Sequence, residues 1–340
     1  MTKKKKMRVR IAPLIGCLVI LFLIFAAPYV SELTRNTSKD GTDVTVTIEQ
    51  GASTAQIAEI LKENKLIKSE IIFKIRAKMS GKAAQMNYGT FVLNTGMCIP
   101  DIIDNLVDNT YRKETVMMTV PEGYSIEQIA SRASQIFGFT EDDFFGALND
   151  DYGYAFLKQI PDTNVKFRLQ GFLFPKTYEF YKDASAHDVI DTMLRQFEIE
   201  VGEIKGYNSL SFYEVLTLAS LIEREALLDR ERPTIAGVIY NRIDKGMRLQ
   251  IDASVVYAVT DGAYDINRVT YKDLEIDSPY NTYKVAGLPA GPICNPGITS
   301  IKAAYEPDNN DYLYYHTDTK KNDGSHIFTK TYEEHVATMN

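Results

Sequence analysis

The chain has 340 residues, of which 45% are hydrophobic and 24% are charged, and its net charge at pH 7 is −7. This length suffices for a membrane segment and two globular units, because single domains usually contain about 100–200 residues. The acidic balance argues against nucleic acid as a partner, since a nucleic-acid-binding face is basic. The histidines form no HExxH or HxH pair, which argues against a zinc site.

Residues 11–30 form an apolar stretch that contains no charged side chain. As a helix this stretch would span about 30 Å, the thickness of the hydrocarbon core of a bilayer. Residues 1–10 are rich in Lys and Arg, so the positive-inside rule places them in the cytoplasm. A cleaved signal peptide is the alternative, although the apolar stretch is long for one. We therefore predict a cytoplasmic tail, a single transmembrane helix at 11–30 and an extracytoplasmic remainder at the cell membrane.

Residues 31–42 are polar and are predicted to form a linker. One pattern then occurs twice, at residues 45–58 and 117–130: a short β-branched strand, a turn at glycine, and a serine that caps an amphipathic helix. A looser third copy covers residues 89–106. The repeated pattern predicts small units in which each strand leads directly into a helix.

Strand–turn–helix units of this kind resemble LysM modules, which bind polymers of N-acetylglucosamine. The predicted fold class is therefore α+β, with a small LysM-like subdomain at residues 43–112 and a larger mixed α+β catalytic domain at residues 113–340. A packing or spacer domain without affinity for sugar is the alternative for the smaller part.

A long apolar helix follows a capping box formed by Ser211 and Glu214. The helix is apolar on almost every face as far as Ile222, so we expect it to be buried. Two acids, Glu223 and Glu225, lie at its end, and the periodicity does not choose between them. Burial raises the pKa of a carboxyl group, as a general acid needs if it is to protonate a glycosidic oxygen near neutral pH. The alternative is an ion pair or a solvated helix end.

A second predicted helix ends at residues 241–242. A turn and an extended segment follow at residues 246–255. Further loops at 278–283 and 287–297 are rich in proline, glycine, amides and hydroxyl groups. Loops of this composition suit hydrogen bonding to the hydroxyl and N-acetyl groups of sugars. The alternative is that proline and glycine merely terminate regular structure here.

These segments, together with others upstream and downstream, resemble the YceG-like family of endolytic murein transglycosylases. The resemblance covers about residues 44–340 and also the N-terminal apolar segment. The motifs that carry it, in chain order, lie at residues 169–178, 219–223, 241–242, 246–252, 278–283, 287–293, 312–314 and 326–328.

The resemblance implies a lyase that cleaves the β-1,4 bond between N-acetylmuramic acid and N-acetylglucosamine in nascent peptidoglycan strands. The product would carry a 1,6-anhydromuramoyl end, and cleavage would terminate glycan elongation. The catalytic glutamate would be Glu223, which protonates the leaving oxygen and then accepts a proton from the attacking C6 hydroxyl group. Because this nucleophile belongs to the substrate, the reaction requires no second carboxylate.

The resemblance also implies that glycan strands are the substrate and that penicillin-binding synthases of the elongation or division machinery are partners. It implies no metal and no organic cofactor. The residues that we expect to bind the substrate are Gln170, Asn241, Gln250, Asp252, Tyr280, Asn281, Thr282 and Tyr283.

Two positions depart from the family pattern, because Gln170 and Lys176 stand where the family commonly has Glu and Asp. If that acid assisted catalysis, Gln170 would have to act through hydrogen bonds alone. Two other functions stay open. A hydrolytic muramidase would use Glu223 with a second carboxyl group, such as Asp252, and water as the nucleophile. A non-catalytic scaffold would bind peptidoglycan through the LysM-like part.

Overall fold

The structure is a computed structural model of the chain. It describes residues 41–49, 51–109, 112–161, 165–202, 206–266 and 268–339. The predicted cytoplasmic tail, transmembrane helix and most of the predicted linker lie outside these residues. No helix in the described part of the chain is both long enough and apolar enough to cross a bilayer. The chain divides into two compact units, Met1–Glu114 and Thr115–Asn340, whereas the sequence predicted a boundary between residues 112 and 113.

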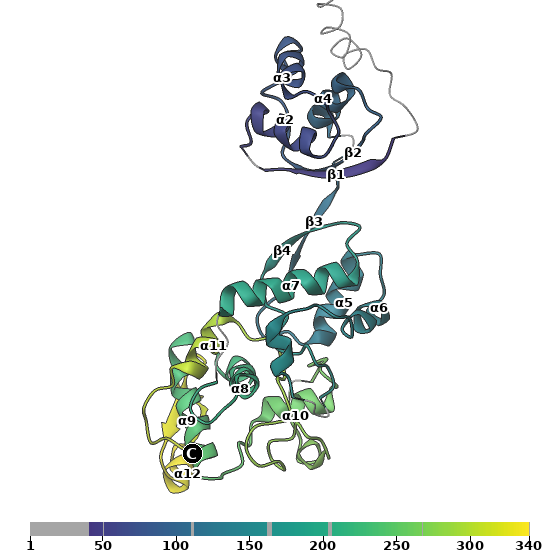
Figure 1. Cartoon of the computed structure of the whole chain (residues 1–340). Coiled ribbons are helices and arrows are strands. Elements are labelled where there is room, and N and C mark those ends of the chain that lie inside the picture. The colour runs from purple at the N-terminus through teal and green to yellow at the C-terminus, as the bar shows by residue number, and fades with distance from the viewer. Residues whose placement is uncertain are drawn as a thin grey trace, which may run out of the picture. The chain divides into compact units, whose positions relative to one another are not determined.

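The first unit pairs two antiparallel strands and covers one face of them with helices (Figure 1). Its elements are β1 (Asp43–Ile48), α2 (Thr54–Glu63), α3 (Glu70–Met79), β2 (Gly89–Asn94) and α4 (Ile99–Asp108). Alternation along β1 buries Val46 and Ile48 and exposes Thr45 and Thr47. The buried side chains meet Leu61 and other apolar residues of the helices in a core of their own.

The second unit contains two more antiparallel strand pairs, β3 with β4 and β5 with β6, among a larger set of helices (Figure 1). Its elements are β3 (Thr115–Thr119), α5 (Ile126–Ile136), α6 (Glu141–Ala147), η1 (Ala155–Gln159), β4 (Thr177–Tyr181), α7 (Ala186–Val201), α8 (Phe212–Glu225), η2 (Asp229–Glu231), α9 (Arg232–Asp244), α10 (Asp252–Val259), η3 (Asp273–Glu275), α11 (Ile298–Tyr305), β5 (Tyr314–Thr317), β6 (His326–Thr329) and α12 (Tyr332–Thr338). Short strands mixed with helices in both units confirm the predicted α+β class.

Helix α8 is the buried helix of the second unit. Every side chain from Val215 to Ile222 is buried, and the helix packs against α9, α10 and α11. The capping box is present, because the Ser211 side chain accepts the N–H of Glu214 while the Glu214 carboxylate accepts the N–H of Ser211. These contacts confirm the predicted start of the helix and its predicted burial.

Both main copies of the repeated pattern have the same local structure. Gly51 and Gly123 have φ angles of +82° and +79°, in the left-handed region that a glycine adopts without strain. Ser53 and Ser125 then cap α2 and α5, each in a capping box with the glutamine three residues later. Strand, turn, cap and helix therefore follow directly from the sequence in both units.

The segment at residues 246–255 differs from the expectation that it is extended throughout. The chain is irregular only as far as Ile251, and α10 begins at Asp252. An acid in the first turn interacts favourably with the positive end of the helix dipole, and the apolar residues that follow support a buried helix. Asp252 therefore lies at a helix start instead of within an extended loop.

Asn295 connects three distant segments of the second unit. Its fully buried side-chain oxygen accepts the N–H groups of Gly171 and Leu173, both at 2.9 Å. Its side-chain nitrogen donates to the carbonyl of Tyr124 at 2.9 Å, and its own backbone N–H donates to the same carbonyl. One amide thus satisfies backbone groups that water cannot reach.

We predict that Asn295→Ala lowers the free energy of unfolding by about 3 kcal/mol, because it leaves buried N–H groups unpaired. The matched control is Asn149→Ala, since Asn149 is exposed near the end of α6, and its effect should stay within about 0.5 kcal/mol. Chemical denaturation followed by circular dichroism measures both changes. Equal losses for the two variants would contradict this role of Asn295.

Candidate active site

A groove of about 570 Å³ lies on the second unit, where α8 ends and α10 begins. Its other walls come from the segment before α10, from β5 and β6, and from α12. The polar residues of its walls that the following paragraphs use are Glu225, Arg242, Gln250, Asp252, Tyr283 and Tyr315. Three histidines, His316, His326 and His335, also line it.

Glu225 is the last residue of α8, and its partly buried carboxyl group faces this groove. One carboxyl oxygen accepts a hydrogen bond from the Tyr315 hydroxyl group at 2.8 Å. The backbone N–H of Ala253, in the first turn of α10, donates to the same carboxyl group. Glu225 is therefore held by a side chain from β5 and by the N-terminus of another helix.

Burial raises the pKa of the Glu225 carboxyl group above its ordinary value, and the charge of Asp252 acts in the same direction. The hydrogen bond from Tyr315, the nearby His326 and the N–H of Ala253 act in the opposite direction and offset part of this effect. Burial also raises the pKa of the Tyr315 hydroxyl group, which therefore keeps its proton and acts as a donor. The groove thus contains one carboxyl group whose protonated form is favoured.

Asp252 is the second acid of the groove. Its side chain is exposed at the start of α10 and accepts a hydrogen bond from the Tyr283 hydroxyl group at 2.5 Å. Gln250 lies two residues earlier, and its backbone N–H donates to the carbonyl of Thr282 at 3.1 Å. The predicted residues Gln250, Asp252 and Tyr283 therefore come together in this groove, beside Glu225.

Arg242 joins two walls of the groove. Its guanidinium group donates to the carbonyl of Leu249 at 2.6 Å and to that of Arg248 at 3.2 Å, both in the segment that leads to α10. It also donates to the carbonyl of Leu313 at 2.6 Å, directly before β5, and lies over the ring of Tyr314. Arg242 thus fixes the position of two chain segments that carry groove residues.

Glu223, the predicted catalytic acid, is not among the residues that line this groove. Its side chain is only 6% exposed and forms an ion pair with Arg232 at 3.1 Å. Its other oxygen accepts the N–H of Gly297 at 2.9 Å. Two residues along a helix turn the side chain by about 200°, which places Glu223 and Glu225 on different sides of α8.

Glu122 lies near Glu223. Partial burial raises the pKa of the Glu122 carboxyl group, the charge of Glu223 raises it further, and the charge of Arg232 opposes both effects. Arg232 also pairs with Asp229 at 2.9 Å. The ion pair between Glu223 and Arg232 ties the end of α8 to the start of α9.

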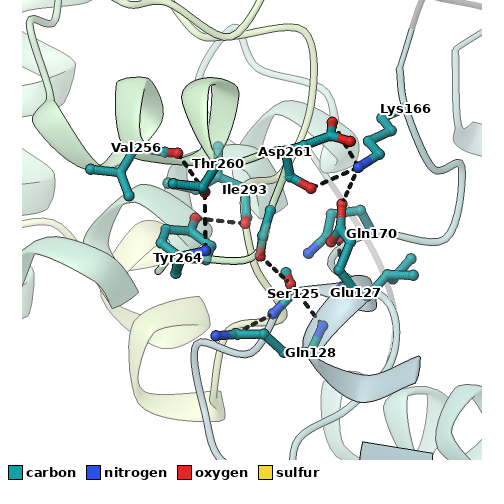
Figure 2. Close-up of polar contacts among 12 residues, drawn as sticks. Ser125, Glu127, Gln128, Lys166, Gln170, Val256, Thr260, Asp261, Tyr264 and Ile293 are labelled. Atoms are coloured by element: carbon teal, nitrogen blue, oxygen red, sulfur yellow. Dashed lines mark hydrogen bonds and ion pairs between the residues drawn. The ribbon is translucent and has the colours of Figure 1, made fainter. Parts of the chain in front are cut away.

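Gln170 is not among the residues that line the groove. Figure 2 shows its surroundings. Its side chain is 1% exposed, and its oxygen accepts the N–H of Ile126 at the start of α5 at 3.0 Å. In the same view Lys166 pairs with both Glu127 and Asp261. A carboxylate at position 170 could accept the same N–H, so Gln170 and the Glu of the family pattern would share this structural role.

Four other residues expected to bind substrate are also absent from the walls of this groove: Asn241, Tyr280, Asn281 and Thr282. The Asn241 side chain donates to the carbonyls of Asn310 and Tyr312. The Asn281 side chain is fully buried and donates to two carbonyls of the loop before it. Both amides therefore hold loops near the groove in place and do not line it.

Thr282 and Tyr280 are buried for similar reasons. The Thr282 hydroxyl group accepts the N–H of Ile251 at 2.8 Å and shares a hydrogen bond with Ser254. Tyr280 is 5% exposed and packs edge-on against Tyr257, and burial raises its pKa to about 12. The hydroxyl of Thr282 supports the turn into α10, which in turn presents Asp252.

The sequence did not identify Arg242 and Tyr315 as site residues, and it offered Glu225 only as one of two candidate acids. Glu225 was one of two equivalent acids at the end of a helix that is apolar all round, so no amphipathic pattern could orient it. Arg242 stood in a recognised motif, and Tyr315 directly follows another. Their contacts with the groove depend on pairing across the chain, which only the folded structure specifies.

Comparisons with known proteins agree on one family. The model of the YceG-like family matches residues 46–340. A Bacillus subtilis protein named endolytic murein transglycosylase is 40% identical over 321 residues, which are 90% of this chain and 87% of that protein. A Streptococcus pneumoniae protein of the same name is 30% identical over 86% of this chain, and the match spans 57% of that longer protein.

A solved structure is also similar. The crystal structure of a yceG-like protein from Listeria monocytogenes has a TM-score of 0.57 and 33% sequence identity, and the match covers 88% of this chain and 99% of that one. The family model and the curated relatives each extend through both units of the fold. From these matches, the chain belongs to the YceG-like family.

Proposed function

We propose that this protein is an endolytic murein transglycosylase, a lyase that cuts peptidoglycan glycan strands internally. The bond cleaved is the β-1,4 bond between N-acetylmuramic acid and N-acetylglucosamine in nascent strands, and cleavage ends glycan elongation. The names of the B. subtilis and S. pneumoniae relatives support the reaction class. The observation that carries the proposal is the partly buried Glu225 carboxyl group, whose protonated form is favoured beside a groove.

Two glutamates at the end of α8 are candidates for the acid and base of the reaction: Glu223, which the family resemblance implies, and Glu225, which lines the groove. The steps would be the same for Glu223 and are given for Glu225. Its protonated carboxyl group donates a proton to the glycosidic oxygen as the bond from C1 of N-acetylmuramic acid breaks. The resulting carboxylate then accepts the proton of the C6 hydroxyl group of the same sugar, whose oxygen bonds to C1. The 1,6-anhydro ring forms without water, and the favourable geometry of an intramolecular nucleophile replaces a second catalytic carboxylate.

The other polar residues of the groove have supporting roles in this proposal. Gln250, Asp252 and Tyr283 offer amide, carboxyl and hydroxyl groups to the hydroxyl and N-acetyl groups of the glycan. Tyr315 holds the Glu225 carboxyl group in place through its hydrogen bond. Its hydrogen bond also keeps the pKa of Glu225 from rising as far as burial alone would raise it.

A hydrolytic muramidase is the second candidate function, because Asp252 lines the same groove as Glu225. In that reaction Asp252 would activate water or act as the nucleophile, and the product would carry a reducing end. The two reactions differ by one water in the product, so their products have different masses.

We further propose that residues 11–30 anchor the chain in the cell membrane, with residues 1–10 in the cytoplasm and both units outside. The apolar composition of the segment and the preceding cations support this arrangement. The order β1–α2–α3–β2 supports a LysM-like, sugar-binding role for residues 43–112. Penicillin-binding synthases that make the strands are the proposed partners.

Glu225→Gln should lower strand cleavage by about 10²–10⁴-fold, because the amide cannot transfer the proton. The same variant should be as stable as the natural chain near pH 7. A carboxyl group whose pKa is raised in the folded state lowers the stability of the folded chain as the pH rises above its unfolded pKa of about 4.3. The neutral amide does not ionise, so the variant avoids this loss. Release of soluble fragments from purified peptidoglycan and thermal unfolding measure the two effects.

Glu223→Gln is the matched control on the same helix. It removes the charge that pairs with the buried Arg232, so it should lower the free energy of unfolding by about 3 kcal/mol. The activity per folded molecule decides between the two candidates, because it is retained if Glu225 is the acid and lost if Glu223 is the acid. An inactive but stable Glu223→Gln protein, with an active Glu225→Gln protein, would reverse the two assignments.

Mass spectrometry of the products tests the reaction class. We expect strands whose new ends are 1,6-anhydro-N-acetylmuramic acid, one water lighter than the products of a muramidase digest of the same strands. Asp252→Asn should slow turnover without changing the product end, because Asp252 supplies a substrate contact only. Reducing ends in the wild-type digest would favour the hydrolytic candidate.

The pH dependence of kcat/KM should report the protonation of Glu225. Activity requires the protonated acid, so it falls as the pH rises through the pKa of this group. Tyr315→Phe removes a hydrogen bond that lowers this pKa, so the falling limb should move to higher pH. Tyr312→Phe, outside the groove, is the control and should leave the limb in place. A limb that moves to lower pH in Tyr315→Phe would contradict the role of Tyr315.

A further inference from the structure

Helix α3 of the first unit exposes an apolar stripe. Ile71, Ile75 and Met79 are 61%, 54% and 74% exposed, and their spacing of four residues places them on one side of the helix. The opposite side of α3 packs into the unit through Ile72, Phe73 and Ala77. The core therefore accounts for one apolar side of α3 and leaves the other without a partner in the described residues.

Cations lie beside this stripe. At about 100° per residue, Lys74 and Lys78 follow one edge of the stripe, whereas Arg76 lies beyond the buried Ile72 on the other side. None of the three forms an ion pair with a described residue, whereas Lys62 and Lys82 of the same region pair with Glu70 and Asp104. The outward face of α3 is therefore apolar along its middle and positive along one edge.

The positive charge is local. Residues 62–82 contain seven Lys or Arg and two Glu, although the whole chain carries a net charge of −7. Solvent-exposed apolar side chains are common singly, but an apolar stripe bordered by cations is typical of helices that lie in the interface of a bilayer. Cations are attracted to the surface of an anionic bilayer, while the apolar stripe enters the boundary of the acyl chains.

We propose that the α3 face, defined by Ile71, Ile75 and Met79 with Lys74 and Lys78, binds the surface of a bilayer that contains anionic phospholipids. Charge complementarity and the exposed apolar stripe together favour a lipid surface over a second protein, which would have to bring a matching acidic rim. The proposal does not depend on the enzymatic activity, and a binding experiment tests it separately.

The chain contains no tryptophan, so one introduced indole reports on one position. The full chain with Ile75→Trp is reconstituted into vesicles of phosphatidylcholine, with or without phosphatidylglycerol. We expect blue-shifted emission, and quenching by brominated acyl chains, in the anionic vesicles and not in the neutral ones. The matched control is Thr45→Trp, on the exposed face of β1 away from the helices, which should stay unquenched in both.

Charge reversal then tests the flanking cations. Adding Lys74→Glu and Lys78→Glu to the Ile75→Trp chain should abolish the quenching in anionic vesicles. Circular dichroism checks that each variant is folded, and Met79→Trp reports on the same face if Ile75→Trp does not fold. Emission typical of water in anionic vesicles would overturn the proposal. So would blue-shifted emission without lipid quenching in both vesicle types, because a protein surface would then cover the face.

Discussion

The hydrogen bond between the Glu225 carboxyl group and the Tyr315 hydroxyl group is the contact on which the proposed site depends. It joins the end of the buried helix α8 to strand β5, two elements that are far apart in the sequence. Burial favours the neutral form of the carboxyl group but does not orient it. The Tyr315 donor and the Ala253 N–H fix its direction while burial still favours the protonated form. Position and protonation therefore have separate structural causes.

Two glutamates two residues apart on α8 have different surroundings. Glu223 is buried in an ion pair with Arg232, the first residue of α9. Glu225 faces the groove and lacks a cation within salt-bridge distance in the described residues. The helical repeat directs the two side chains to different sides of α8.

The sequence was sufficient for the local structure of this chain and insufficient for the orientation of the site. Capping boxes such as Ser211 with Glu214, and the burial of α8, follow from residue types at short spacing. The orientations of Glu223 and Glu225 do not follow from residue types. A helix that is apolar on every side has no polar face that would indicate which acid points toward a groove. Asn281 and Thr282 were predicted to bind sugar because amide and hydroxyl side chains form hydrogen bonds. In the structure the same groups form hydrogen bonds with the backbone. Irregular loops leave backbone groups unpaired, and amide and hydroxyl side chains satisfy them.

The guanidinium group of Arg242 holds two walls of the groove at a fixed separation. Its planar fork reaches the carbonyls of Leu249 and Leu313 at the same time, so the segment before α10 and the segment before β5 stay at one separation. A lysine, with a single compact ammonium group, could not span both partners in this way. The width of the groove between these segments therefore depends on one side chain, which itself lines the groove. A glycan bound there would have to fit the opening that this side chain maintains.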